Sequence, residues 1–236
     1  MLEIIETALL LILSFLPPLI YMVWIRNTEK YNRERWKPII LCFFWGASIA
    51  VIAAIVLEFI LGYSLAISIE NAEMIPFLTV VIVAPVVEEF TKPLALRLKS
   101  VKKEIDELED GLIYGAVAGL GFSATENLFY GKSFLAEGFL FFLILITLRS
   151  IGACLLHASA TAWTGYGYGK TLLKKTSLIR VMPYFLLAIF LHAFYNFLLS
   201  FNQLGALVGL IASFGFVFIS IKIVRRKIRI LDLKNR

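Results

Sequence analysis

Seven apolar runs, each long enough to cross a lipid bilayer as a helix, take up most of this 236-residue chain. A transmembrane helix needs about 20 residues, because each residue adds about 1.5 Å to its length. Hydrophobic residues make up 60% of the chain and charged residues only 17%. The sequence therefore predicts an all-α, polytopic membrane helix bundle. The runs lie at about residues 4–25, 38–62, 74–97, 111–131, 138–168, 180–201 and 204–223.

Lysine and arginine gather in alternate segments between these runs. Of the 23 basic residues, 20 lie in residues 26–37, 97–103, 170–180 and 222–236. Basic loops stay on the cytoplasmic side of a membrane, so we predict an N-terminus outside and a cytoplasmic C-terminus. The net charge of +6 is explained by this topology and by contact with the anionic inner leaflet of the lipid bilayer, and no nucleic-acid partner is expected.

The chain is expected to form one integral membrane domain over residues 1–236, with the chemically informative core at about residues 74–200. Its two cysteines, Cys42 and Cys154, each fall inside an apolar run, which argues against a disulfide framework or a cysteine metal cluster. No internal repeat or soluble domain is recognisable. The sequence gives no indication of an oligomeric state.

Three charged residues lie inside the third apolar run: Glu88, Glu89 and Lys92. An acidic or basic side chain in mid-membrane costs roughly 2.5–3.5 kcal/mol and usually faces a cavity or the bundle interior. Glu88 and Lys92 are four residues apart, the favourable order for an ion pair, whereas Glu89 is rotated by about 100° and is expected to stay free for chemistry. The alternative is a structural ion pair, or a helix that ends near Pro93.

The fourth run carries small residues and a carboxylate on one helical face. Gly115, Gly119, Phe122 and Glu126 recur at intervals of four, three and four, so another helix can approach Glu126 closely. The alternative is a helix-packing seam with Glu126 near the outer interface. Glu126 falls toward the outside of its run while Glu88 falls toward the inside, so the two converge only if helices tilt, shift or break.

The two histidines of the chain, His157 and His192, lie in the fifth and sixth runs. Each has a polar neighbour one turn later, Thr161 and Asn196 respectively. A buried histidine is often a hydrogen-bonded core residue, but two of them beside intramembrane acids favour a functional site. Arg149 is expected to pair with Glu126 or Glu137, or to lie nearer the outer surface.

Several known hydrolase motifs are missing from the sequence. It contains no His-Glu-x-x-His, so a zincin-type metal helix is not encoded. Ser123 lies in Gly-Phe-Ser-Ala-Thr rather than in Gly-x-Ser-x-Gly, and no Gly-x-Gly-Asp occurs. A Ser123–His157 dyad stays open as an alternative.

Four motifs occur in order on successive runs: Glu88-Glu89-x-x-Lys92, Phe122-x-x-x-Glu126-Asn127, His157-x-x-x-Thr161 and His192-x-x-x-Asn196. Together they resemble the PrsW family of intramembrane proteases, in the superfamily that includes the CAAX prenyl endopeptidases and the Aph subunit of gamma-secretase. The CAAX-type relatives usually carry an arginine where Lys92 stands and a histidine where Glu126 stands. The resemblance therefore favours PrsW and argues against prenylated substrates.

The resemblance implies a helical bundle with a polar cavity that hydrolyses a peptide bond of a membrane-anchored protein, an anti-sigma factor in characterised bacterial members. It implies that Glu89, or alternatively Glu88, is the general base, and that Lys92 keeps the other acid ionised. Glu126 and Asn127 would orient these groups or share the water.

The remaining implied roles belong to the histidine motifs. His157 would position water or donate a proton, and His192 and Asn196 would bind the developing oxyanion. In a metal-dependent version Glu126, His157 and His192 would hold zinc or another divalent metal and leave a second acid as base. Competing functions are a proton-coupled transporter or ion channel, and a non-catalytic membrane scaffold.

Overall fold

The computed structural model describes residues 2–234, and all regular elements within them are helical, which confirms the all-α prediction. Short 3-10 and π-helical segments, labelled η, interrupt the α-helices. In chain order the elements are α1 (Leu2–Arg26), α2 (Trp36–Trp45), η1 (Gly46–Ala50), α3 (Val51–Ser68), α4 (Met74–Leu78), η2 (Thr79–Val83), α5 (Ala84–Thr91), η3 (Lys92–Arg97), α6 (Lys99–Lys102), α7 (Leu108–Ala136), α8 (Phe139–Leu173), η4 (Leu178–Val181), α9 (Met182–Ser200), η5 (Asn202–Leu204) and α10 (Ala206–Asp232).

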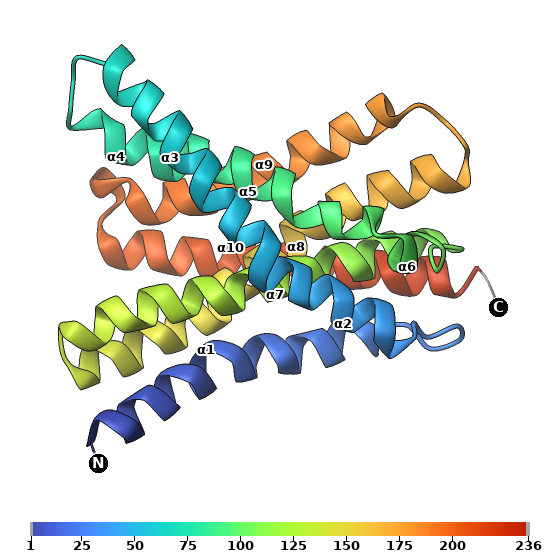
Figure 1. Ribbon diagram of the computed structural model, residues 1–236, viewed down its shortest axis with the longest axis horizontal. Helices are drawn as coiled ribbons and strands as arrows, with labels where there is room; N and C mark the ends of the chain where they lie inside the picture. The colour runs from blue at the N-terminus through green and yellow to red at the C-terminus, as the bar shows by residue number, and fades with distance from the viewer. Residues whose placement is uncertain (1, 235–236) are drawn as a thin grey trace.

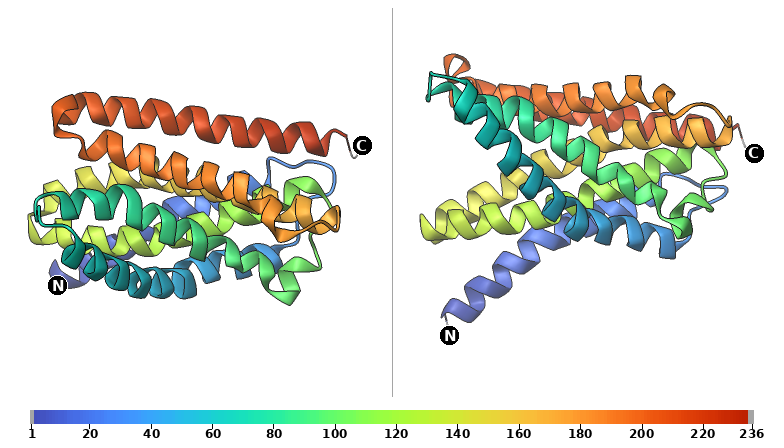
Figure 2. Two further views of the ribbon diagram at one scale, coloured as in Figure 1. Left: turned by 90° about the horizontal axis from the view of Figure 1, so that it is seen from above. Right: turned by 45° about the horizontal axis from the view of Figure 1, so that its top comes forward.

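The long helices run roughly along the long axis of the molecule, and the chain crosses from end to end between turns (Figure 1). The N-terminus lies at one end. The loop after α1, the α6 region, the loop after α8 and the C-terminus all lie at the other end (Figure 1). The four basic segments therefore share one end of the bundle, which is the arrangement that the predicted orientation requires. Helix α1 diverges from the other helices toward its N-terminus (Figure 2).

Six helical segments of the described chain are long and apolar enough to cross a membrane: 4–26, 36–68, 74–97, 139–173, 178–200 and 206–232. They correspond to six of the seven predicted runs. The remaining run, the fourth (111–131), lies within α7 and is less apolar than the others. Its position explains the difference, because residues 109–124 are all buried and so need no lipid-compatible surface.

The outer helices present large apolar side chains at the molecular surface. Phe59 is 76% exposed and Ile67 is 70% exposed, and both lie on α3. A water-soluble domain would bury such side chains, whereas a membrane protein places them against lipid. The chain is a multi-pass membrane protein, and the cell membrane is its expected location.

Glycines hold α7 and α8 in direct backbone contact along the centre of the bundle. A Cβ atom added to Gly115 would lie 2.6 Å from the carbonyl oxygen of Thr161, and one added to Gly119 would overlap the carbonyl oxygen of His157. The glycine face of the fourth run is thus occupied by the helix that carries His157, as the spacing predicted. Gly165 packs in the same way against Gly111, and α8 continues as one helix through this segment.

Gly119→Ala is expected to lower the stability of the folded protein by about 1–3 kcal/mol, because the added methyl group would force α7 and α8 apart. Thermal unfolding of the detergent-solubilised protein measures the effect. Gly62→Ala is the matched control, since Gly62 is also helical and has nothing within 4 Å of its ideal Cβ position. Equal midpoints for the two variants would contradict the proposed close packing.

Candidate active site

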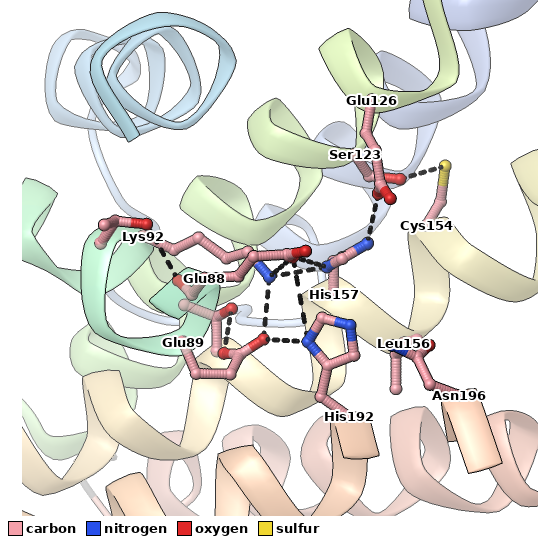
Figure 3. A network of polar contacts seen from close by, with 12 residues as sticks. Glu88, Glu89, Lys92, Ser123, Glu126, Cys154, Leu156, His157, His192 and Asn196 are labelled. Carbon is pink, nitrogen blue, oxygen red and sulfur yellow. Dashed lines mark hydrogen bonds and ion pairs between the residues drawn. The ribbon is translucent and has the colours of Figure 1, made fainter. Parts of the chain in front are cut away.

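The predicted polar residues of four runs meet inside the bundle (Figure 3). Glu88 and Glu89 come from α5, Lys92 begins η3, and the other members come from α7, α8 and α9. A cavity of about 480 Å³ opens beside them and is lined by the side chains of Glu88, Glu126, His157, His192 and Asn196, among others. The expectation that these groups share one pocket is met, although Glu88 and Glu126 had been placed at different depths.

Lys92 occupies the centre of the cluster and is fully buried. Its ammonium nitrogen Nζ lies 2.8 Å from Glu88 Oε2 and 2.9 Å from Glu89 Oε1. It also donates to His157 Nδ1 at 2.8 Å, and it stands over the Phe122 ring at 4.5 Å. The sequence predicts that Lys92 neutralises one carboxylate and leaves the other free. Instead Lys92 forms ion pairs with both acids, with Glu88 four residues before it and with Glu89 three residues before it. One cation therefore neutralises both carboxylates.

The two adjacent carboxylates differ in how many partners they have. Glu89 is 0% exposed, and its Oε1 contacts both Lys92 and His192 Nδ1, the latter at 3.0 Å. Its Oε2 accepts a hydrogen bond from Thr161 Oγ1 at 2.8 Å. Glu88 is 6% exposed and lines the cavity, and its Oε2 has no hydrogen-bond partner of good geometry despite its contact with the Lys92 ammonium. Glu88 is therefore the carboxylate available to a substrate or water.

His157 links the α5 acids to the α7 acid. Its Nδ1 accepts from the Lys92 ammonium, so the ring proton is on Nε2, which lies 2.8 Å from Glu126 Oε2. This bridge explains how residues drawn at different membrane depths act together. His192 stacks edge-on to the same ring, with centroids 4.9 Å apart.

His192 forms a carboxylate–histidine pair with Glu89. The Nδ1–H of His192 donates to the fully buried Glu89, and this assigns the lone pair to Nε2. With its lone pair free, His192 Nε2 can accept a proton or bind a metal. It does not donate to an oxyanion, so the tautomer favours a different role for His192 from the predicted one.

Glu126 is held on its other side by a cation. Arg149 Nη2 lies 3.0 Å from Glu126 Oε2, and Arg149 Nε donates to Asn127 Oδ1 at 3.1 Å. The Arg149 guanidinium also covers the Tyr130 ring at 3.9 Å. Of the three placements considered for Arg149, the ion pair with Glu126 is confirmed. Asn127 reaches the site by orienting Arg149.

Two further sequence-predicted groups point elsewhere. Asn196 Nδ2 donates to the carbonyl oxygen of Val80 at 2.9 Å, in the π-helical segment η2, although the side chain still lines the cavity. Ser123 Oγ donates to Cys154 Sγ at 3.3 Å. The geometry thus gives the Ser123–His157 dyad no support.

Glu58, which lies on α3 and lines the cavity beside Glu126, was not among the predicted site residues. It is the one acid in the apolar run 38–62. The rule that singled out Glu88 and Glu126, an acid in an apolar run, applies equally to Glu58. The residues around Glu58 form none of the four motifs, so no second feature of the sequence pointed to it.

Three donors of this site have the spacing of a metal-binding group. One ligand atom each from Glu88, His157 and His192 lies within 4.8 Å of the others, and all three residues are buried. Two histidines and a carboxylate fit zinc in type and number. Glu89 bound to His192 is the outer partner that such a ligand normally has. For His157 Nδ1 to join, the Lys92 ammonium has to withdraw from it. Glu88 thus completes the set, whereas the predicted set used Glu126.

A polytopic helix bundle with carboxylates and histidines around one cavity has the groups that hydrolysis inside a membrane requires. The comparisons agree, because the chain matches the family described as "PrsW family intramembrane metalloprotease" over residues 34–223 and so belongs to that family. It is 33% identical over 122 residues to "Protease PrsW" of Clostridioides difficile (strain 630). That match covers 51% of this chain and 50% of the relative, about half of its length. No solved structure matches the chain.

Proposed function

We propose that this protein is an intramembrane endopeptidase that hydrolyses a peptide bond of a membrane-anchored protein. One observation carries the proposal: Glu88, Glu126, His157 and His192, from four separate helices, line one cavity. Membership of the PrsW family supports a peptidase over a transporter, a channel or a scaffold.

Glu88 is the general base in the proposed mechanism. Its side chain lines the cavity, and the carboxylate removes a proton from a water that attacks the substrate carbonyl. Lys92 and His157 fix the side chain of Glu88 from behind. When the tetrahedral intermediate collapses, the carbon–nitrogen bond breaks and Glu88 returns the proton to the leaving amine. This assignment takes Glu88, the second of the two acids considered, in place of the enclosed Glu89.

Arg149 is the group that we assign to the developing oxyanion. Its guanidinium lines the cavity, and its Nη2, though 3.0 Å from Glu126 Oε2, has no hydrogen-bond partner of good geometry. A fixed positive charge in a low-dielectric cavity stabilises developing negative charge strongly. Asn127 and Tyr130 hold Arg149 in position.

A divalent metal would be held by Glu88, His157 and His192, and when bound it supplies Lewis-acid activation of a water. Elemental analysis of the purified protein tests this version. Stoichiometric zinc that is absent from His192→Ala, with activity lost to a chelator and restored by zinc, would establish it. Full activity in metal-free protein would establish the version in which Glu88 acts alone.

The proposed activity predicts new peptide termini in membrane proteins of cells that express the wild-type chain. N-terminal labelling and mass spectrometry compare these cells with cells that express Glu88→Gln at the same level. We expect termini within or beside a single membrane span, present only with the wild type. An anti-sigma factor, the substrate that the resemblance implies, would be found by the same measurement. Identical termini in both samples would contradict the proposal.

A further inference from the structure

Carboxylates from three distant parts of the chain meet at the end of the bundle that holds the C-terminus. Glu29 lies in the loop after α1, Glu109 in the first turn of α7, and Asp232 at the end of α10. All three are buried, and one oxygen of each lies within 4.8 Å of the others. These segments lie at the same end of the molecule (Figure 1).

A second group overlaps the first and shares Glu29. One oxygen each of Glu29, Glu107 and Asp110 also lies within 4.8 Å of the others. Glu29 thus stands between the start of α7 and the end of α10. We refer to these five acids, Glu29, Glu107, Glu109, Asp110 and Asp232, as the terminal carboxylate cluster.

In the terminal carboxylate cluster, Glu29 Oε1 and Glu107 Oε2 are buried without a hydrogen-bond partner. Glu29 is 0% exposed, and its other oxygen accepts from the Glu34 backbone N–H at 3.1 Å. Within the part of the chain that the structure describes, no lysine or arginine forms an ion pair with Glu29 or Asp232. A buried carboxylate oxygen without a donor or cation is costly, and a bound cation would remove that cost.

The loop after α1 orients the Asp232 side chain toward Glu29. Its two carboxylate oxygens accept from the backbone N–H groups of Lys30 and Tyr31 at 3.0 and 3.1 Å. These bonds join residues about 200 positions apart in the sequence. Each carboxylate oxygen has a second lone pair, so Asp232 can bind a cation while keeping both bonds.

We propose that Glu29, Glu109 and Asp232 bind a hard divalent cation, Ca²⁺ or Mg²⁺, which ties the loop after α1 to α7 and α10. The donors are all carboxylate oxygens, which these ions prefer. Oxygens on opposite sides of Ca²⁺ lie about 4.6–5.2 Å apart, twice the usual ligand distance, and the observed spacing is compatible with this. Glu107 and Asp110 add negative charge beside the ion. The site is separate from the cavity that contains His157 and His192.

Metal-depleted, full-length protein in detergent provides the test. Saturating Ca²⁺ or Mg²⁺ is expected to raise the thermal midpoint by about 5 °C or more, and separate titrations show which ion is bound. Mn²⁺, followed by its paramagnetic resonance signal, is the direct binding probe. Glu29→Gln is expected to weaken Mn²⁺ binding at least tenfold, and to raise the midpoint of the metal-free protein because it removes a buried negative charge.

Matched variants separate this site from others. Glu104→Gln removes an acid at the same end that already pairs with Arg35 and Lys103, and it should bind Mn²⁺ as the wild type does. His192→Ala should also keep this binding, which distinguishes it from a metal in the active site. If Glu29→Gln folds poorly, Asp232→Asn replaces it. A midpoint unaffected by both ions, or wild-type Mn²⁺ affinity in the folded Glu29 or Asp232 variant, would overturn the proposal.

Discussion

Glu88→Gln is expected to lower the rate of peptide-bond hydrolysis by about 10²–10⁴-fold, the usual contribution of a general base. Glutamine keeps the size of the side chain but cannot take a proton from water. The loss is expected with and without a metal, since Glu88 is either the base or a metal ligand. Cleavage of a substrate identified by its new terminus, in liposomes at equal protein content, measures the effect.

Two comparisons sharpen this result. Glu137→Gln removes an exposed acid outside the site and should leave the rate unchanged. Glu89→Gln should reduce the rate through loss of order around Lys92 and His192, and should also lower the thermal midpoint, because Glu89 has three partners. A Glu88→Gln variant that kept the wild-type rate would remove Glu88 from the mechanism.

Lys92→Met is expected to destabilise the folded protein by about 3–5 kcal/mol, the cost of removing one partner from a buried ion pair. Methionine fills a similar volume but leaves Glu88 and Glu89 facing each other without the cation between them. Activity should be lost as well, since His157 Nδ1 loses its donor. Thermal or denaturant unfolding in detergent measures the stability.

A double-mutant cycle tests whether this cost is electrostatic. Adding Glu89→Gln to Lys92→Met removes one uncompensated charge, so the double variant should be more stable than the sum of the two single effects predicts. Lys132→Met, at an exposed lysine outside the core, should change the midpoint little. Strict additivity in the cycle would show that Lys92 contributes packing rather than charge.

The predicted runs and the observed helices agree because both follow from hydrophobic length. The run 138–168 became α8 and the run 204–223 became most of α10, since an apolar stretch in lipid has to satisfy its own backbone hydrogen bonds. Glycines at helical spacing likewise predicted a close helix contact, and α8 lies on that face. Four short motifs suggested the family, and the match over residues 34–223 confirmed it.

The errors concern contacts between helices. Whether Lys92 serves one acid or two, and whether Asn196 faces His192 or Val80, depends on rotamers and on the neighbouring helix. Glu88 and Glu89 are equivalent by residue type, and only the position of the cavity distinguishes them. Glu58 is an acid in an apolar run and was recognisable as a candidate from the sequence. Its place beside Glu126 in the cavity comes only from the packing of α3.

The sequence by itself determined that this chain crosses a membrane many times and that its intramembrane acids, lysine and histidines need partners, because an unpaired charge in lipid is too costly. The tertiary structure alone decided which partners they have. Helical periodicity gives the face on which a residue lies, but the axial stagger of two helices comes from their packing, such as the contact of Gly119 with the backbone of His157. That stagger brings Glu126 to the same histidine as Lys92, and the packing of α10 brings Asp232 to the loop that follows α1.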